Sequence, residues 1–398
     1  MISLIQPSRN NLKYLKWSYA SVRRNAGPGI EVCVADDFSN DGTWEWCLET
    51  MEHDPHFKAI RNAGPVRLGH TILYDRLINE VATQPIIGIW HADMYMTPGT
   101  VEQIIEAVKP GVVVSLTRIE PPLHPPGPEK VLMDFKTEPE DFNEEDFLKW
   151  YQGYQFSAKG KITEGIFAPW FLLKEDFQST GGHDPLYAPQ SKEDSDIFNR
   201  FLLKGYSFVQ LWEAAVYHMT CRGSRFNPTL TEVGKNSNEW EAQNIRSTKN
   251  FIRKWGHFVK HDSLMKPIVP PKYDIAFRVT NCSIQTLEGL EPWCTAISSD
   301  ASYSEWVREE QKNTRFNMLA RVMPWNAALG NDVVVEFDAS KLTQKSFQFI
   351  QQLPEILEFN KEIGEFEYDI FRIKVRTLTT YEKELIKLDS PYYSNQLL

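Results

Sequence analysis

Carboxylates follow two short, largely apolar segments of this chain, in positions that suggest metal and phosphate chemistry. Asp36 and Asp37 come directly after residues 30–35, and Asp93 follows residues 86–90. Such a segment is typical of a buried parallel strand that brings an acid to the carboxyl edge of a sheet. Ligands of open α/β sheets bind outside that edge, where carboxylates can hold a divalent cation and a phosphorylated ligand. We therefore expect these acids to share one acidic pocket.

Alternating strands and helices would position those acids. Such alternation predicts an α/β fold with a mostly parallel sheet and helices on both of its faces. Strands are expected at 2–5, 30–35, 57–61, 86–90 and 112–116, and helices from Asn10 or Asn11 to Arg24 and at 43–52, 68–82 and 97–108.

The chain changes in character after these elements. Residues 120–160 are rich in proline and then in acidic residues, so we expect a loop excursion that is either functional or disordered. A helix is expected at 192–205, because acids open it and Lys-Gly closes it. Short strands at 208–211 and 214–217 then lead to His218.

Two domains are expected from the length of 398 residues and from a proline-rich boundary at 266–271. The first comprises residues 1–265 and includes a polar extension at 219–265. The second comprises residues 272–398 and is a small α+β accessory domain to which the sequence assigns no role. Its strands are expected at 273–280, 332–338 and 367–375, and its helices at 302–322 and 344–359.

Composition limits the partners and the compartment. The net charge of -10 argues against nucleic acid as the main partner, but it allows a nucleotide, because a divalent cation neutralises a diphosphate locally. Five scattered cysteines without a Cys-x-x-Cys pair indicate neither a zinc site nor a disulfide framework and fit a reducing compartment. The N-terminus lacks signal-peptide features, and no apolar run approaches the ~20 residues that span a bilayer. A cytoplasmic protein is expected.

Several spaced motifs follow one another along the first part of the chain. They are Asp-Asp-x-Ser-x-Asp-Gly-Thr at 36–43, Asn-x-Gly at 62–64, His-Ala-Asp at 91–93, Gly-Gly-His-Asp at 181–184, Glu-Asp-x-Asp at 193–196, Lys-Gly-Tyr at 204–206 and His218. In this order they resemble the motifs of the family 2 glycosyltransferases of the GT-A fold. The resemblance covers residues 1–220 and ends before the last third of the chain.

The resemblance implies a donor site for a nucleotide-diphospho-sugar with Mn²⁺ or Mg²⁺. The expected nucleotide-binding residues are Pro7, Asp36, Asp37 and His91, and the expected metal ligands are Asp93 and His218. His91 stands where the family usually has Asp, and its neutral imidazole could contact the ribose, bind a softer ion such as Mn²⁺ or weaken metal binding. The alternatives are turn or helix capping for Asp37 and a structural hydrogen bond for His218.

The resemblance also implies an acceptor side. The expected catalytic base is Asp194, because backbone N–H groups near a helix start keep it ionised and able to deprotonate an acceptor hydroxyl. Attack from the side opposite the nucleotide would invert the anomeric configuration. The residues expected to contact the acceptor or the sugar are Glu193, Asp196, Trp170 and His183. For the acids at 193–196 the alternative is a solvated acidic helix start, and for Trp170 it is packing in the core.

Together these expectations describe an inverting glycosyltransferase of the hexosyltransferase type, with an acceptor hydroxyl on a saccharide, a lipid or a protein. One alternative is a GT-A-like module without catalysis that binds sugars or mediates assembly, and His91 is the feature that favours it. A sugar-phosphate nucleotidyltransferase ranks lower, because residues 6–10 lack the glycine of a triphosphate-binding loop.

Overall fold

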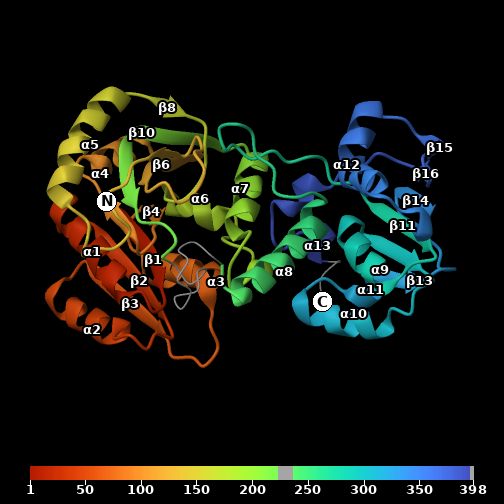
Figure 1. Cartoon of the computed structure of the whole chain (residues 1–398), viewed down its shortest axis with the longest axis horizontal. Coiled ribbons are helices and arrows are strands. Elements are labelled where there is room, and N and C mark those ends of the chain that lie inside the picture. The colour runs from red at the N-terminus through yellow and green to blue at the C-terminus, as the bar shows by residue number, and fades with distance from the viewer. Residues whose placement is uncertain (223–235, 395–398) are drawn as a thin grey trace. The chain divides into compact units, whose positions relative to one another are not determined.

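The chain forms two compact units in the computed structural model, which describes residues 1–222 and 236–394 (Figure 1). The first unit contains Met1–Gln243 and His261–Pro267, and the second contains Asn244–Lys260 and Ile268–Leu398. Residues 244–260, which the sequence suggested as part of an extension of the first domain, thus pack with the second unit. None of the helices in the described part of the chain combines the length and the apolar character that a bilayer crossing requires.

The first unit is built on a ten-stranded mixed sheet with the order β3-β2-β1-β4-β9-β6-β10-β5, to which β7 and β8 add short pairings. The adjacent strands β3, β2, β1 and β4 are parallel to one another, whereas β9 and β5 run antiparallel to the strands beside them. The strands are β1 Ile2–Ser8, β2 Glu31–Asp37, β3 Phe57–Asn62, β4 Ile86–Ile89, β5 Met94–Met96, β6 Val112–Glu120, β7 Lys130–Leu132, β8 Ile162–Thr163, β9 Trp170–Leu173 and β10 Ser207–His218.

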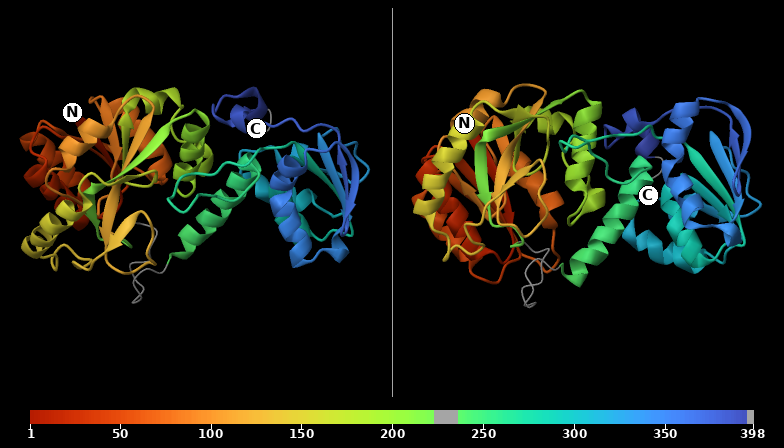
Figure 2. Two further views of the ribbon diagram at one scale, coloured as in Figure 1. Left: turned by 90° about the horizontal axis from the view of Figure 1, so that it is seen from above. Right: turned by 45° about the horizontal axis from the view of Figure 1, so that its top comes forward.

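Helices cover both faces of this sheet (Figure 2). On β1, Ile2 and Leu4 pack into the core cluster that includes α1, α2 and α4, while Ile5 packs into the cluster of α3, α6 and α7. Both faces are therefore apolar, as expected for the central strands of a parallel sheet. The helices are α1 Leu12–Asn25, α2 Thr43–His53, α3 Gly69–Arg76, α4 Thr100–Ala107, α5 Glu144–Ala158, α6 Lys174–Ser179 and α7 Glu193–Leu203.

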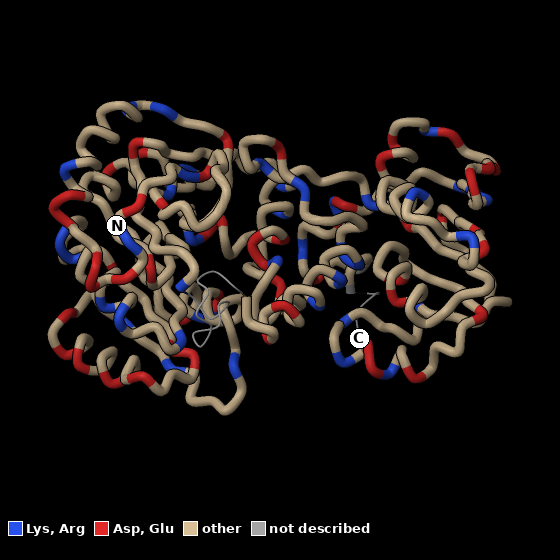
Figure 3. The backbone as a smooth tube through the Cα atoms, in the orientation of Figure 1, with Lys and Arg blue, Asp and Glu red and all other residues tan. Residues whose placement is uncertain are grey.

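The predicted α/β class is confirmed, but two segments differ in their secondary structure from the prediction. Residues 120–160, expected as a loop excursion, contain β7 and α5, and Phe147 and Tyr151 of α5 are buried beside Tyr95 and Tyr217. The two short strands expected at 208–217 form one strand, β10, with an irregularity between Leu211 and Ala215. Glu45, Glu49 and Glu52 of α2 are exposed. Figure 3 shows how the acidic and basic positions are distributed along the chain.

The second unit contains a smaller sheet with the order β13-β12-β11-β14-β16-β15, parallel from β13 to β14 and antiparallel beyond. The α+β character predicted for this part is confirmed. The strands are β11 Ile275–Thr280, β12 Ala296–Ser299, β13 Val322–Pro324, β14 Val333–Asp338, β15 Gly364–Tyr368 and β16 Phe371–Val375. The helices are α8 Asn238–Trp255, α9 Ile284–Leu290, α10 Ser304–Glu310, α11 Met318–Arg321, α12 Gln344–Asn360 and α13 Pro391–Ser394. The first residues of α8, up to Gln243, belong to the first unit.

Element boundaries in the second unit differ from those predicted. The strand expected at 367–375 is a hairpin, because Asp369 adopts a positive φ of 55° and turns the chain between β15 and β16. The helix expected at 302–322 breaks into α10 and α11. The helix expected at 344–359 is α12, which a capping box of Thr343 and Ser346 begins.

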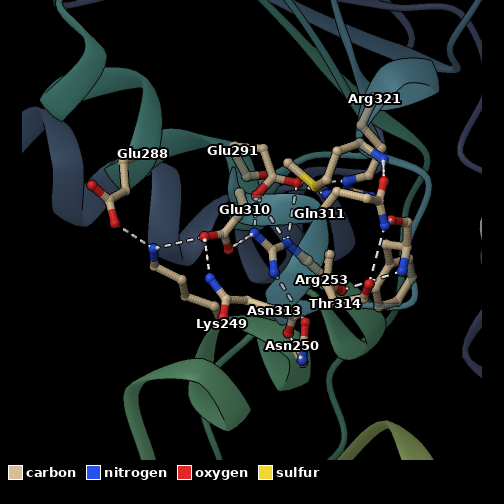
Figure 4. A network of polar contacts seen from close by, with 12 residues as sticks. Lys249, Asn250, Arg253, Glu288, Glu291, Glu310, Gln311, Asn313, Thr314 and Arg321 are labelled. Atoms are coloured by element: carbon tan, nitrogen blue, oxygen red, sulfur yellow. Dashed lines mark hydrogen bonds and ion pairs between the residues drawn. The ribbon is translucent and has the colours of Figure 1, made fainter. Parts of the chain in front are cut away.

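A buried charge network joins α8 to the rest of the second unit (Figure 4). The Arg253 guanidinium donates to Glu291 at 2.7 Å and to Glu310 at 2.5 Å, and Arg321 donates to Glu291 at 2.5 Å. Burial opposes ionisation of Glu291, but attraction to the two arginines lowers its pKa to about 2. Two buried arginines thus compensate two buried glutamates.

Candidate active site

A pocket of about 410 Å³ lies at the carboxyl edge of the first sheet. Pro7 at the end of β1, Asp93 just after β4 and His218 at the end of β10 contribute to its wall. Glu193 and Asp194 at the start of α7 face the same space. The pocket therefore occupies the position at which open α/β sheets bind ligands.

Three side chains in this pocket form a candidate metal centre. His91, Asp93 and His218 each offer one ligand atom, and these atoms lie within 4.8 Å of one another. The register of β10 on β5 explains the arrangement, because His218 pairs with Met94 and the Met219 N–H donates to the Asp93 carbonyl at 3.0 Å. Two imidazoles and a carboxylate can bind a divalent transition-metal ion, for which imidazole is a common ligand.

Glu120 supports His218 from behind. Its Oε1 lies 2.7 Å from His218 Nδ1, while the other ring nitrogen, Nε2, lies 3.4 Å from Asp93 Oδ1. Arg118 and Lys130 hold Glu120 at 2.9 and 3.2 Å. A carboxylate that fixes one nitrogen of a histidine and leaves the other for the ion is a common arrangement around protein metals.

The two histidines differ in electrostatics. Burial lowers the pKa of His91 to about 3, so its imidazole is neutral and has a lone pair available. Burial also disfavours charge on His218, but attraction to Asp93 and the contact with Glu120 raise its pKa to about 9. A bound cation would replace the proton that His218 carries between the two carboxylates, since metal binding requires a deprotonated nitrogen.

Glu193 and Asp194 form a second reactive group in the pocket. They follow Ser191 and Lys192, two consecutive residues with positive φ values of 81° and 74°, a strained turn that starts α7 without a side-chain cap. Burial and the neighbouring Asp194 raise the pKa of Glu193 to about 7, and burial raises the pKa of Asp194. Perturbed carboxylates of this kind are typical of functional sites.

Asp36 and Asp37 are buried but are not among the residues that line the pocket. Asp36 accepts from the Ser39 N–H at 3.1 Å and pairs with Arg61. Asp37 accepts from the Leu68 and Gly69 N–H groups at 3.0 and 2.8 Å, and so fixes the loop before α3. Within the described part of the chain, the carboxylate of Asp37 therefore holds the backbone at the start of α3 and does not cap the turn or helix that follows it in the sequence.

Three of the residues expected on the acceptor side lie behind the pocket wall. Trp170 is fully buried and its ring packs against Phe198 and Phe201. The side chain of His183 is fully buried, and Asp196 is fully buried in an ion pair with Arg200 at 2.9 Å. None of the three is among the lining residues, so direct contact with a sugar is not carried forward for them.

Sequence reasoning missed most of the other lining residues. Arg118 and Glu120 were missed because the predicted strand stopped at 116, whereas β6 continues to Glu120 and its alternation points both side chains the same way. Lys130 lies in the segment expected to be a loop. The missed residues include the cationic Arg9, Arg118 and Lys130 and also His70, Tyr74, His124 and Trp240. Arg222, whose position after His218 suggested a contact with a diphosphate, also lines the pocket.

Residues 3–180 match the model of the family described as Glycosyl transferase family 2. The resemblance inferred from the motifs is thereby confirmed over this region. The motifs from Gly181 to His218 lie beyond the matched residues. Comparison with curated protein sequences finds no match.

Solved structures of glycosyltransferases show partial similarity. GalNAc-T7 with UDP, GalNAc and Mn²⁺ aligns with a TM-score of 0.45 and 14% identity over 64% of this chain, which spans 48% of that protein. Mannosyltransferase PcManGT from Pyrobaculum calidifontis, in complex with GDP-Man and Mn²⁺, aligns with a TM-score of 0.43 and 16% identity over 67% of both chains. S. aureus TarS 1-349 in complex with UDP aligns with a TM-score of 0.39 and 15% identity over 54% of this chain and 59% of that one.

Proposed function

We propose, from the glycosyltransferase family 2 region at residues 3–180, that the first unit transfers a sugar from a nucleotide-diphospho-sugar to an acceptor hydroxyl. The observation that carries this proposal is that one pocket contains both a candidate metal centre and two adjacent carboxylates, Glu193 and Asp194, with raised pKa values. Transfer of a glycosyl group needs stabilisation of a leaving diphosphate and a base for the acceptor, and the pocket offers residues for both.

The donor side of the proposal rests on the metal centre and the basic lining. His91, Asp93 and His218 would hold the ion, which supplies charge neutralisation at the diphosphate when bound. Arg9 and Arg222 lie on the same lining and offer guanidinium groups that pair well with phosphate oxygens. Pro7 borders the pocket and Asp37 fixes the loop before α3, so we assign the nucleotide to this end.

The acceptor side of the proposal rests on Asp194. One of its carboxylate oxygens takes the proton of the acceptor hydroxyl as that oxygen bonds to the anomeric carbon. The bond from the anomeric carbon to the diphosphate breaks at the same time, and its electron pair leaves with the diphosphate. Attack from the face opposite the nucleotide inverts the configuration. Glu193 hydrogen-bonds the acceptor hydroxyl and orients it.

The donor set makes a specific demand on the ion. Imidazole nitrogen is a better ligand for Mn²⁺ than for Mg²⁺, which prefers oxygen and keeps its water. With His91 and His218 beside one carboxylate, we propose a preference for Mn²⁺. His91→Asp should reduce this preference, measured as the ratio of Mn²⁺ to Mg²⁺ dissociation constants. An unchanged ratio would remove His91 from the ligand set.

The test is ligand-induced stabilisation of the whole chain by UDP-, GDP-, dTDP- and CMP-sugars, with and without Mn²⁺. A ligand at 100 times its dissociation constant adds about 2.7 kcal/mol to the unfolding free energy. We expect one nucleotide to raise Tm only with metal, less in Asp93→Asn and equally in Asp194→Asn. Metal-dependent binding without any sugar transfer would instead support the alternative of a sugar-binding module without catalysis.

A further inference from the structure

A buried histidine lies directly behind the proposed base, and we infer that the pair Asp75–His183 acts as a positioning device that keeps Asp194 ionised. This inference rests on the proposed function of Asp194. His183 does not line the pocket, so it acts through Asp194 rather than on the substrate.

Asp75 on α3 fixes one side of the imidazole. Its Oδ1 lies 2.7 Å from His183 Nδ1, and its two oxygens accept from the His183 backbone N–H at 3.2 and 3.0 Å. An ionised carboxylate only accepts hydrogen bonds, so Nδ1 carries the proton. Gly182 permits this approach, because a Cβ at that position would lie 2.0 Å from Asp75 Oδ2.

The other ring nitrogen faces the proposed base. His183 Nε2 lies 4.0 Å from Asp194 Oδ1, and both atoms are buried without a hydrogen-bond partner among the described residues. With Nδ1 protonated, a neutral ring would present a lone pair to a carboxylate oxygen, which is unfavourable in a buried site. A proton therefore resides on one of these two atoms, and the second carboxylate at Asp75 favours Nε2.

The charges around the imidazole agree with a proton on His183 Nε2. Burial lowers the pKa of His183, but the hydrogen bond and attraction to Asp75, together with Asp194 and Glu193, raise it overall. On the other side, burial raises the pKa of Asp194, while attraction to His183 and, to a smaller extent, the Trp170 indole N–H lower it. Arg200, whose guanidinium donates to the carbonyls of Thr180 and Gly182, is paired with Asp196.

The arrangement has a chemical consequence. A positive imidazolium behind Asp194 stabilises the anion that must accept the hydroxyl proton, while the oxygens on the pocket side stay free to reach it. A buried acid that orients and charges a histidine is a recurring way to set the protonation of a catalytic group. Here the histidine serves a carboxylate base instead of acting as the base.

The first test is the pH profile of kcat/KM for transfer. In His183→Gln, which keeps a polar side chain but loses the charge, the acid limb should shift to higher pH by about one pH unit. Activity at low pH then falls about tenfold while activity on the alkaline side stays near that of wild type. Asp75→Asn should shift the limb in the same direction. A uniform loss at every pH, or no shift, would overturn the inference.

The control variant is Asp176→Asn on α6, which removes a carboxylate that accepts from the Gly111 N–H and from Tyr206 but does not touch Asp194. It should lower stability without moving the acid limb. A comparable shift in this control would mean that the limb reports general destabilisation instead of the charge at His183.

A second measurement does not depend on turnover. Nitrogen NMR of the full chain with labelled histidines, in which His183→Gln assigns the signal, should show His183 doubly protonated at neutral pH. Asp75→Asn and Asp194→Asn should each lower its apparent pKa. The inference is overturned if His183 is a single neutral tautomer at neutral pH and if its apparent pKa is unchanged in Asp194→Asn. Absence of transfer with the NMR result intact would count against the proposed function alone.

Discussion

Two clusters of buried charge, one in each unit, are organised in opposite ways. In the second unit, Arg253 and Arg321 meet Glu291 and Glu310 in close ion pairs (Figure 4). In the pocket of the first unit, the neighbouring Glu193 and Asp194 both have raised pKa values. Glu193 is buried and the Asp194 side chain is partly exposed, and each keeps an oxygen without a hydrogen bond among the described residues. Close ion pairs compensate the buried charges of the second unit, whereas the pocket carboxylates have no ion pair that close among the described residues, since His183 Nε2 lies 4.0 Å from Asp194 Oδ1. Carboxylates with perturbed pKa values are typical of functional sites.

The largest effect expected from this contrast is on catalysis. Asp194→Asn removes the proposed base, and kcat should fall about 10²–10⁴-fold, the usual contribution of general-base catalysis. The same change also removes the negative charge that faces His183 at 4.0 Å, and because the Asp194 side chain is partly exposed the unfolding free energy should fall by no more than about 1 kcal/mol. Both are measured on one preparation, by initial rates and by urea unfolding. A large loss of stability would make Asp194 part of the structural framework.

The matching change in the second unit should lower the stability of the protein instead of its activity. Arg253→Leu leaves Glu291 buried with one cation fewer, and should lower the unfolding free energy by about 3–5 kcal/mol. Lys249→Met is the control, because Lys249 pairs with Glu288 and Glu310 at a partly exposed edge and is worth at most about 1 kcal/mol. Equal effects of the two substitutions would contradict the picture of a compensated network.

An intermediate effect is expected at the carboxylate that supports the metal centre. Glu120→Gln keeps the shape of the contact with His218 but loses the charge, and should weaken Mn²⁺ binding 10–100-fold by calorimetry, the usual range for such partners. Glu129→Gln is the control, since Glu129 pairs with Arg118 and Lys130 but not with His218. If both variants bind Mn²⁺ alike, Glu120 has no specific role.

The smallest effect is a difference in pH dependence. The pKa of Glu291 is lowered from 4.5 to about 2, so its contribution is present above the unfolded value and is lost as pH falls toward 2. The pKa of Glu193 is raised from 4.5 to about 7, so the stability from its protonated form is lost as pH rises through that value. Glu193→Gln should therefore gain stability relative to wild type between pH 5 and pH 8, measured by urea unfolding across that range. A constant difference would contradict the raised pKa.

Much of the fold and the metal cluster could be predicted from local sequence. Apolar segments that end in acids predict the parallel strands, and the order of the motifs predicts that Asp93 and His218 share one metal site. The antiparallel strand β5 was missed, because Met94–Met96 is too short for a periodic signal and depends on pairing with β10. Helix α8 was missed because its surface is polar and rich in charge.

The parts of the site that could not be predicted depend on contacts between distant residues. Glu120 supports His218 only because β6 and β10 are neighbours in the sheet. The motif at 181–184 suggested that His183 faces a sugar, but its position behind Asp194 depends on Asp75 from α3. Burial of Trp170 follows from the packing of α6 and α7 on the sheet, which no local pattern specifies.

The most direct test of the central claim is release of nucleoside diphosphate from a panel of nucleotide-sugars by the purified chain, with Mn²⁺ and a mixture of saccharide acceptors. We predict release from one donor that requires the metal, that is abolished in Asp93→Asn, and that falls at least 10²-fold in Asp194→Asn. Release that persists unchanged in both variants, or no release from any donor by a chain that binds one, would contradict a glycosyl-transfer site in this pocket.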